Sequence, residues 1–321
     1  ISTAISYTNG PPHIGHAYEV IAADAIARFK RLDGYDVFFL TGTDEHGLKV
    51  QKKAKELGID PKKYVDKISK EFIKLSISLN CSNDDFIRTT DERHIKNVHS
   101  IWKILFDKGD IYLDQYSGWY SITDEAFYNE EELIKTESNS FLSPNGNPVE
   151  WVDEESYFFK LSKYQNNLLE LYERNEKFIL PSSRMNEIKN FVKSGLKDIS
   201  ISRKNISWGI PVKENKDHSI YVWLDALTNY ISALDWSDNN ESFKRFWPAD
   251  IHLIGKDITR FHAVYWPAFL FSAGIEIPKM IFSHGFLLNK GEKISKSIGN
   301  TVDPFELINF FGVDQLRFYL L

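Results

Sequence analysis

Apolar and polar positions in the first fifty residues follow two kinds of pattern. Residues 2–7, STAISY, form a short apolar run that ends at the turn residues NGPP. Apolar side chains then recur at helical spacing, at Ala22, Ala25, Ile26, Phe29 and Leu32. A second apolar run, VFFLTG at residues 37–42, predicts a buried strand. A strand, a helix and a second strand make a βαβ unit, which predicts a doubly wound parallel sheet whose strand ends open on one edge.

The pattern changes character near residue 110 and changes back near residue 218. Helical spacing continues through residues 61–79 and 92–108, and residues 110–217 are then rich in aromatic, acidic and turn residues. Strand and helix patterns typical of the sheet resume in YVWLDALTNY, DIHLIGKDITRFHAVYWPAFL and KMIFSHGFLL. We therefore expect an α/β domain in two halves, residues 1–109 and 218–290, interrupted by an inserted module at residues 110–217.

Both ends of the sequence lack the usual boundary signals. The chain starts with ISTAISY, without an initiator methionine and without the charged and apolar regions of a signal peptide. It stops inside the amphipathic pattern FGVDQLRFYLL, where no helix-capping signal is present. We expect these 321 residues to be part of a longer chain.

Composition limits the class of protein. The sequence is 42% hydrophobic and 14% aromatic, so the chain can bury a large core. Cys81 is the single cysteine, which excludes an intrachain disulfide. No apolar run reaches the roughly 18 to 20 residues that a membrane span requires. These features predict a cytoplasmic protein without a membrane partner.

The charge balance argues against one class of nucleic-acid protein. The formal net charge is −6, whereas non-specific coating of nucleic acid depends on clustered Lys and Arg. One local cluster is present, formed by Lys49, Lys52, Lys53 and Lys55. We interpret this cluster as the solvated face of a short helix.

Two of the nine histidines, His13 and His16, stand in the tetrapeptide HIGH at the start of the first predicted helix. Such a pair can bind a metal ion, fill a local structural role, or bind phosphate at the helix N-terminus. No third ligand stands close by in the sequence, which disfavours a metal site. Gly15 between the two rings would let a nucleotide approach the backbone, so phosphate binding and core packing remain as interpretations.

A second candidate for phosphate binding lies near the far end of the chain. Neither common glycine-rich phosphate loop occurs, since the sequence contains no GxGxxG and no GxxxxGK[ST]. The segment NKGEKISKSIGN instead places Lys293 and Lys296 on a Gly- and Ser-containing loop after the last predicted strand. Lysines on such loops are usually solvated, but HIGH after a first strand combined with KISKS after a late strand is far more specific than either motif alone.

The two motifs together resemble the paired signature of the class I aminoacyl-tRNA synthetases. Within that class the chain is similar to the methionyl-tRNA synthetase family from end to end, in the order AISYTNGPPHIGH, FLTGTDEHG, DISISR, YVWLDALTNY, LIGKDITRFHAVYWPA and SHGFLLNKGEKISKSIGN. The resemblance implies a Rossmann-like catalytic domain interrupted by a connective-peptide module. It further implies that residues 291–321 hold the KISKS loop and the start of a segment leading to a helical anticodon-binding domain.

The resemblance implies a methionine–tRNA ligase as well. Such an enzyme uses ATP with Mg²⁺ to convert methionine into methionyl-adenylate and pyrophosphate, and then charges tRNA(Met). The catalytic residues implied are His13, His16, Lys293 and Lys296. The ATP-binding residues implied are His13, Gly15, His16, Gly255, Asp257, Lys293, Ser295 and Lys296. The methionine-binding residues implied are Ala4, Ile5, Tyr7, Asp44, Arg203, Trp223, Ala226, Leu227, Tyr230, Ile258 and His262.

Two alternatives remain open from the sequence. The nearest is another class I synthetase. Those for branched aliphatic amino acids carry a much longer editing insert, and the cysteine enzyme needs a thiolate-rich zinc pocket that Cys81 alone cannot form. The other alternative is a non-catalytic tRNA-binding relative, against which the intact HIGH and KISKS motifs argue.

The inserted module differs from many members of this family, which hold zinc there through two Cys-x-x-Cys pairs. The corresponding positions are Ser121 with Asp124 and Ser143 with Gly146, and residues 110–217 contain no Cys or His. Hydroxyls and one carboxylate are poor zinc ligands, so we expect no zinc. We expect aromatic burial to stabilise the module instead, through Tyr116, Trp119, Tyr120, Phe127 and Tyr128.

Overall fold

The computed structural model describes residues 1–321 except residues 125, 137–139, 205, 239, 290 and 295–300. The strands of the main sheet are β1 (Ser2–Thr3), β2 (Ser6–Tyr7), β3 (Leu40–Asp44), β4 (Asp85–Arg88), β10 (Ile179–Leu180), β14 (His252–Gly255) and β15 (Ile281–His284). Among the described residues they pair in the order β10-β15-β14-β1-β3-β2, and β4 also pairs with β3. Every pairing is parallel. The predicted doubly wound parallel sheet is therefore confirmed.

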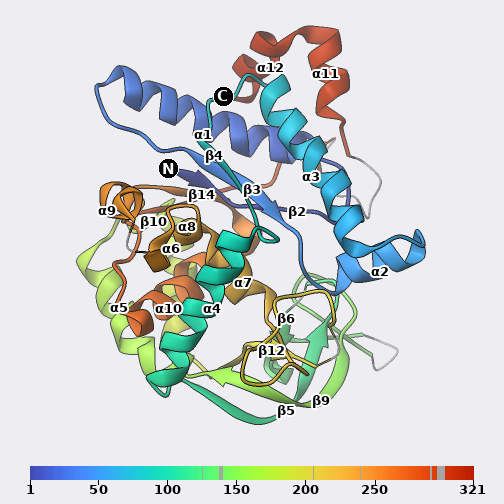
Figure 1. Ribbon diagram of the computed structural model, residues 1–321, viewed down its shortest axis with the longest axis vertical. Coiled ribbons are helices and arrows are strands. Elements are labelled where there is room, and N and C mark those ends of the chain that lie inside the picture. The colour runs from blue at the N-terminus through green and yellow to red at the C-terminus, as the bar shows by residue number, and fades with distance from the viewer. Residues whose placement is uncertain (125, 137–139, 205, 239, 290, 295–300) are drawn as a thin grey trace.

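Helices cover both faces of this sheet (Figure 1). One face carries α1 (Ile14–Leu32), α3 (Pro61–Ser78), α11 (Pro304–Phe311) and α12 (Val313–Leu320). The other face carries α4 (Glu92–Asp107), α8 (Asn229–Ser232) and α10 (Trp266–Ala273). Further helices are α2 (Leu48–Glu56), α5 (Gln165–Arg174), α6 (Ser182–Lys193), α7 (Val222–Leu227) and α9 (Glu241–Phe246). The helices predicted over residues 61–79 and 92–108 are confirmed by α3 and α4.

Helix α1 confirms the first predicted helix, but its buried face is not the one marked by the apolar spacing from Ala22 to Leu32. Phe29 is 62% exposed and Leu32 is 89% exposed. The fully buried side chains of this helix include Ala17, Ile21, Ala23 and Ala27. Alanines suit the close contact between α1 and strands β1 and β14, yet they give a weaker hydrophobic signal than Phe or Leu. The spacing therefore predicted the helix and not its orientation.

A second sheet, which is antiparallel, is built from β5 (Ile111–Ser121), β6 (Ala126–Tyr128), β9 (Glu150–Phe159) and β11 (Ile199–Ser200). Its order is β11-β9-β5-β6. The long pair β5 and β9 stays in register from Ile111 opposite Phe159 to Tyr120 opposite Glu150. Ile111 and Phe159 belong to the main hydrophobic core, so one end of this ladder is fixed in the part of the molecule that contains the main sheet.

Part of the expected insert returns to the main sheet. Strand β10 pairs with β15 through Ile179 opposite Ile281 and Leu180 opposite Phe282. The buried side chains of α5 and α6 belong to the same core cluster as Phe269 of α10. A strand of two residues gives no periodic pattern in the sequence, so the sequence alone places strand β10 in the insert.

Three short strand pairs lie outside the two sheets. They are β7 (Ile134–Lys135) with β8 (Phe141–Leu142), β12 (Ser202–Arg203) with β13 (Ser219–Ile220), and β16 (Leu288–Asn289) with β17 (Glu292–Lys293). In the part of the chain that the structure describes, no helix has both the length and the apolar character needed to cross a membrane.

The positions compared with zinc ligands form a hydrogen-bonded knuckle around Asp124. Its Oδ1 accepts from the side-chain amides of Asn147 (2.7 Å) and Asn145 (3.2 Å), and its Oδ2 accepts from the Tyr128 hydroxyl (2.9 Å). Ser121 Oγ accepts the N–H of Asp124 at 3.3 Å. These residues do not fit a zinc site, because the single carboxylate already serves three donors. Over the described residues, no group of three or more His, Cys, Asp or Glu side chains is placed to hold a metal ion.

Aromatic burial in this module is partly as predicted. Tyr120 is 6% exposed and Tyr128 is 8% exposed. Trp119 is half-buried, with its ring 4.9 Å from that of Phe141 and 5.4 Å from that of Trp151. The side chains of the other two predicted members, Tyr116 and Phe127, lie outside the described residues.

Candidate active site

The candidate residues gather at the carboxyl edge of the main sheet. Tyr7 ends β2 directly opposite Asp44, which ends β3. Gly255 ends β14 opposite His284, which ends β15. Because parallel strands bring their carboxyl ends to one edge, segments from four parts of the chain meet there, as is usual for ligand sites in open α/β sheets.

His13 and His16 cap the start of α1. His13 Nδ1 accepts the N–H of Gly15 at 3.1 Å, and His16 Nδ1 accepts the N–H of His13 at 3.0 Å. The two rings stack with their centroids 3.9 Å apart. Since both Nδ1 atoms accept from the backbone, each neutral ring carries its proton on Nε2, which is then a hydrogen-bond donor. The structural role and the phosphate-binding role are therefore compatible.

The local structure requires glycine at position 15, independently of any nucleotide that approaches the backbone there. A Cβ atom on this residue would come within 2.9 Å of the His13 ring. A side chain at position 15 would displace that ring and break the cap. Gly15 is thus needed for the conformation of the histidine pair itself.

The described residues next to positions 295–300 lie beside the start of α1. The backbone of Lys293 belongs to β17, whereas its side chain, Ser295 and Lys296 lie outside the described residues. Ile294 packs in the same apolar cluster as Ile14 of α1. The N–H of Ile14 also donates to the carbonyl of Val302 at 3.0 Å. Residues on both sides of positions 295–300 therefore contact α1, at whose start the HIGH residues lie.

Gly255 and Asp257 are brought together at the end of β14. A Cβ atom on Gly255 would lie 2.8 Å from Asp257 Oδ1, so the glycine makes room for this carboxylate. Two further polar residues stand nearby, and sequence reasoning missed both. Glu19 of α1 accepts the N–H of Ala4 at 2.8 Å, and its other oxygen lies 3.5 Å from His284 Nε2. Burial raises the pKa of Glu19.

Tyr230 and His262 form a neutral hydrogen-bonded pair. His262 Nδ1 lies 3.0 Å from the carbonyl of Ile258, which can only accept, so this nitrogen carries the ring proton. His262 Nε2 consequently accepts from the Tyr230 hydroxyl at 2.7 Å. Burial lowers the pKa of His262 to about 4, so the ring is neutral at physiological pH.

Other predicted methionine-site residues surround this pair. The Trp223 ring stacks on Phe261 at 3.6 Å and meets His262 edge-on at 6.5 Å. Ala226 and Leu227 are buried in α7. The main core cluster, which contains Leu227 and Tyr230, is also contacted by Ala4, Ile5, Trp223 and Ile258. Tyr7 differs, because its ring packs against the separate cluster that contains Val50 and Tyr64.

The loop after Asp44 is tied to α7 by a buried carboxylate that sequence reasoning also missed. Asp225 of α7 is fully buried and lies 2.6 Å from His46 Nδ1 and 2.7 Å from His94 Nε2. Burial favours a raised pKa for Asp225, but the two imidazoles outweigh it and lower the pKa to about 2. The sequence offers a signal only for the His46 side of this contact, namely the pattern TDEHG, which has three ionisable residues in a row after a buried strand.

Arg203 is buried and contacts strand β5. Its guanidinium lies 5.1 Å from the Tyr120 ring of β5 and 4.6 Å from the Tyr221 ring, and Nη1 donates to Ser200 Oγ at 2.7 Å. A small cavity beside it is lined by His46, Trp208 and Tyr221 among others. The predicted approach of Arg203 to Asp44 stays a prediction.

A doubly wound sheet, a histidine pair capping its first crossover helix and a lysine-bearing segment beside that helix define the catalytic fold of the class I aminoacyl-tRNA synthetases. The family model described as tRNA synthetases class I (M) matches residues 1–321. The chain is 57% identical over 321 residues to the methionine–tRNA ligase of Brucella suis, and 58% identical over 322 residues to that of Rhizobium meliloti. Each match covers 100% of this chain and 62% of the relative.

Solved structures agree with the sequence relatives. The methionyl-tRNA synthetase of Mycobacterium tuberculosis bound by methionyl-adenylate has a TM-score of 0.96 and 54% identity, covering 99% of this chain and 63% of that one. The free-state structure of the same protein has a TM-score of 0.83 and 50% identity, covering 99% of this chain and 60% of that one. The chain therefore belongs to the methionine family of class I tRNA synthetases, and it spans 62% of the length of the curated relatives above.

Proposed function

We propose that this chain carries the methionine-activating part of a methionine–tRNA ligase. Methionine and ATP, the latter as its Mg²⁺ complex, react to methionyl-adenylate and pyrophosphate, and the methionyl group then passes to the terminal adenosine of tRNA(Met). The observation that carries the proposal is the TM-score of 0.96 to a relative bound by methionyl-adenylate, over 99% of the chain. In this proposal residues 1–109 and 218–290, joined by strand β10 in the main sheet, form the catalytic domain, and the antiparallel part of residues 110–217 forms the connective module. Residues 291–321 lead to an anticodon-binding domain, and the protein is cytoplasmic.

Adenylate formation in this site relies on position and charge rather than on a strong base. The methionine carboxylate is itself the nucleophile at the α-phosphate, so no side chain has to remove a proton. The Nε2 donors of His13 and His16 meet the phosphates at the N-terminus of α1, where the helix dipole also favours negative charge. Lys293, Ser295 and Lys296 act on the charge of the leaving pyrophosphate. Gly255 and Asp257 bind the adenosine.

Methionine is recognised at its two ends. Asp44 receives the ammonium, and Arg203 acts on the carboxyl or phosphate charge. The thioether lies among Trp223, Tyr230 and His262, because sulfur makes favourable contacts with aromatic rings. The remaining predicted residues shape the apolar wall and floor, namely Ala4, Ile5, Tyr7, Ala226, Leu227 and Ile258.

Amino-acid-dependent pyrophosphate exchange into ATP tests this function. We expect exchange with methionine and far less with leucine, isoleucine, valine or cysteine. A preference for one of those amino acids would assign the chain to another specificity. No exchange with any amino acid, from protein shown to be folded, would favour a non-catalytic tRNA-binding relative.

A further inference from the structure

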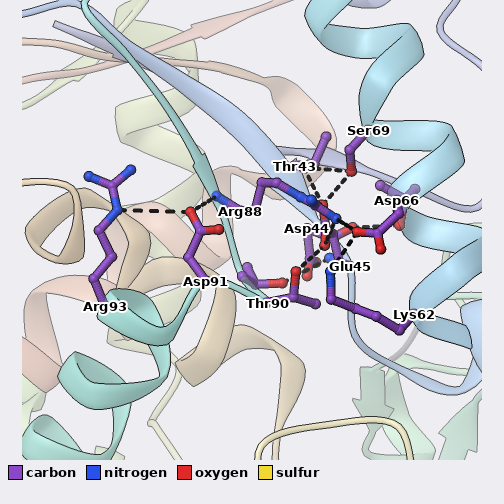
Figure 2. Close-up of polar contacts among 12 residues, drawn as sticks. Thr43, Asp44, Glu45, Lys62, Asp66, Ser69, Arg88, Thr90, Asp91 and Arg93 are labelled. Atoms are coloured by element: carbon purple, nitrogen blue, oxygen red, sulfur yellow. Dashed lines mark hydrogen bonds and ion pairs between the residues drawn. The ribbon is translucent and has the colours of Figure 1, made fainter.

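Glu45, the residue after Asp44, lies at the centre of a buried polar network (Figure 2). Its side chain is fully buried. Oε1 accepts from the hydroxyls of Thr43 (2.7 Å) and Ser69, and from Arg88 Nε (2.7 Å). Oε2 accepts from Arg88 Nη2 (2.9 Å) and from the Thr90 hydroxyl (2.5 Å). The carboxylate is therefore held from β3, α3, β4 and the loop after β4.

The charges of this network compensate one another. Arg88 Nη2 also donates to Asp66 of α3 at 2.5 Å, and Lys62 donates to the same carboxylate oxygen at 2.5 Å. Lys62, Asp66, Arg88 and Glu45 thus form a chain of alternating charge with a sum of zero. A paired and fully hydrogen-bonded carboxylate can remain ionised when buried, whereas removal of one partner leaves an uncompensated charge.

The network also fixes the backbone on both sides of Asp44. The N–H of Glu45 donates to Thr89 Oγ1 at 2.9 Å, and its carbonyl accepts from Trp208 Nε1 at 2.6 Å. The carbonyl of Thr43 accepts the N–H of Thr89 at 3.2 Å. In an extended chain, alternate side chains point to opposite faces, so Thr43 and Glu45 face the network while Asp44 faces the other way.

We propose that Glu45 is a positioning residue for Asp44, which it directs toward the ammonium of the amino-acid substrate. Glu45 touches no substrate in this account. It acts by anchoring the end of β3 to Arg88, Ser69 and Thr90, so that Asp44 cannot rotate away from the pocket. This assignment rests on the proposed function, which gives Asp44 the role of ammonium partner.

The variant Glu45→Gln tests the proposal, because it preserves size but turns an amide toward the donors of Arg88. We expect KM and Kd for methionine to rise about tenfold, since small displacements of a binding group have effects of that order. We expect kcat and KM for ATP to stay within about twofold, because the adenosine site is built on β14. Pyrophosphate exchange and calorimetry measure these constants.

The matched control is Arg93→Gln. Arg93 of α4 pairs with Asp85 at 2.8 Å next to the network, and within the described structure it is not among the hydrogen-bond partners of the Glu45 side chain. Figure 2 shows Arg93 beside Asp91, apart from Glu45. This variant should lower the melting temperature without changing KM for methionine. Thr90→Val removes a single donor to Glu45 and should raise KM for methionine about twofold. If Glu45→Gln does not fold, this variant tests the positioning role in its place.

A double-mutant cycle separates positioning from a general structural role. If Glu45 acts through Asp44, Glu45→Gln should weaken methionine binding no further in an Asp44→Ala background. Additive losses, or unchanged methionine constants in a destabilised Glu45→Gln protein, would overturn the positioning role and leave the proposed function intact. Failure of the unsubstituted protein to exchange methionine would instead overturn the proposed function.

Discussion

Asp44 is 8% exposed at the end of β3, where an acidic group can pair with an ammonium shielded from water. We predict that Asp44→Ala weakens methionine binding by about 2 kcal/mol, because it leaves the substrate charge without its partner. Affinity for ATP should not change. Calorimetry with each substrate measures both effects. Equal methionine affinity in the variant would mean that another group binds the ammonium.

His262 makes the stability of the folded chain depend on pH. Burial lowers its pKa from 6.5 to about 4, so between these values the unfolded chain binds more protons than the folded one. The free energy of unfolding should therefore fall as the pH drops from about 6.5 toward 4 and level off below, by on the order of 3 kcal/mol from this group. Urea denaturation across that range measures the slope.

The matched variant for this effect is His262→Gln, which cannot titrate there. Its free energy of unfolding should depend less steeply on pH than that of the unsubstituted protein. A residual slope is expected, because burial also lowers the pKa of the neighbouring His252. Identical slopes in the two proteins would show that His262 is not held neutral by the fold.

At this scale, motif resemblance led to the residues that we propose to face the substrates and missed those that hold them in place. Asp44 and His262 stand inside segments that resemble the family pattern. Glu45 and Asp225 are buried and Glu19 is half-buried, and each has a partner from a distant part of the chain. No spacing within one segment carries that information, because a network is defined only when the elements have packed.

Among the elements, the helices with strong periodicity were predicted well, whereas the two-residue strand β10 was not. α3 begins at Pro61, where the Asp60 side chain accepts the N–H of Lys63, a combination of cap and proline that the sequence shows directly. Strand β10 has two residues, and only its pairing with β15 reveals it. Local signals therefore located helices, while sheet membership depended on long-range contacts.

The Asp124 knuckle belongs to the scale of an element, because it joins two turns of the inserted module. We predict that Asp124→Ala destabilises the chain by about 1 to 3 kcal/mol, since it leaves Tyr128, Asn145 and Asn147 without their common acceptor. Thermal unfolding of the two proteins measures the difference. Metal analysis should find no stoichiometric zinc, and a chelator should leave the melting temperature unchanged. One zinc per chain, lost together with stability, would contradict this account.

At the scale of the whole molecule, the groups proposed for adenylation lie between Ala4 and Lys296, while the chain covers 62% of the length of its relatives. We predict methionine-dependent exchange from residues 1–321 but poor charging of tRNA by this part alone, because the proposed adenylation groups all lie within it whereas it spans only part of the length of its relatives. Parallel exchange and aminoacylation assays on this chain and a longer protein test the difference. Equal charging by both would show that the additional length is dispensable.

The β5–β9 ladder is held in place by contacts at both of its ends. Its root, Ile111 and Phe159, is fixed in the main core, and near its far end Tyr120 rests on Arg203. The ladder is roughly 30 Å long at about 3.4 Å per residue, so a 1 Å displacement at Tyr120 corresponds to a tilt of only about 2° at the root. Such a tilt breaks no strand pairing. A substrate that shifts Arg203 would thus tilt the β5–β9 ladder about its fixed end. The angle of the ladder would then depend on whether the site is occupied.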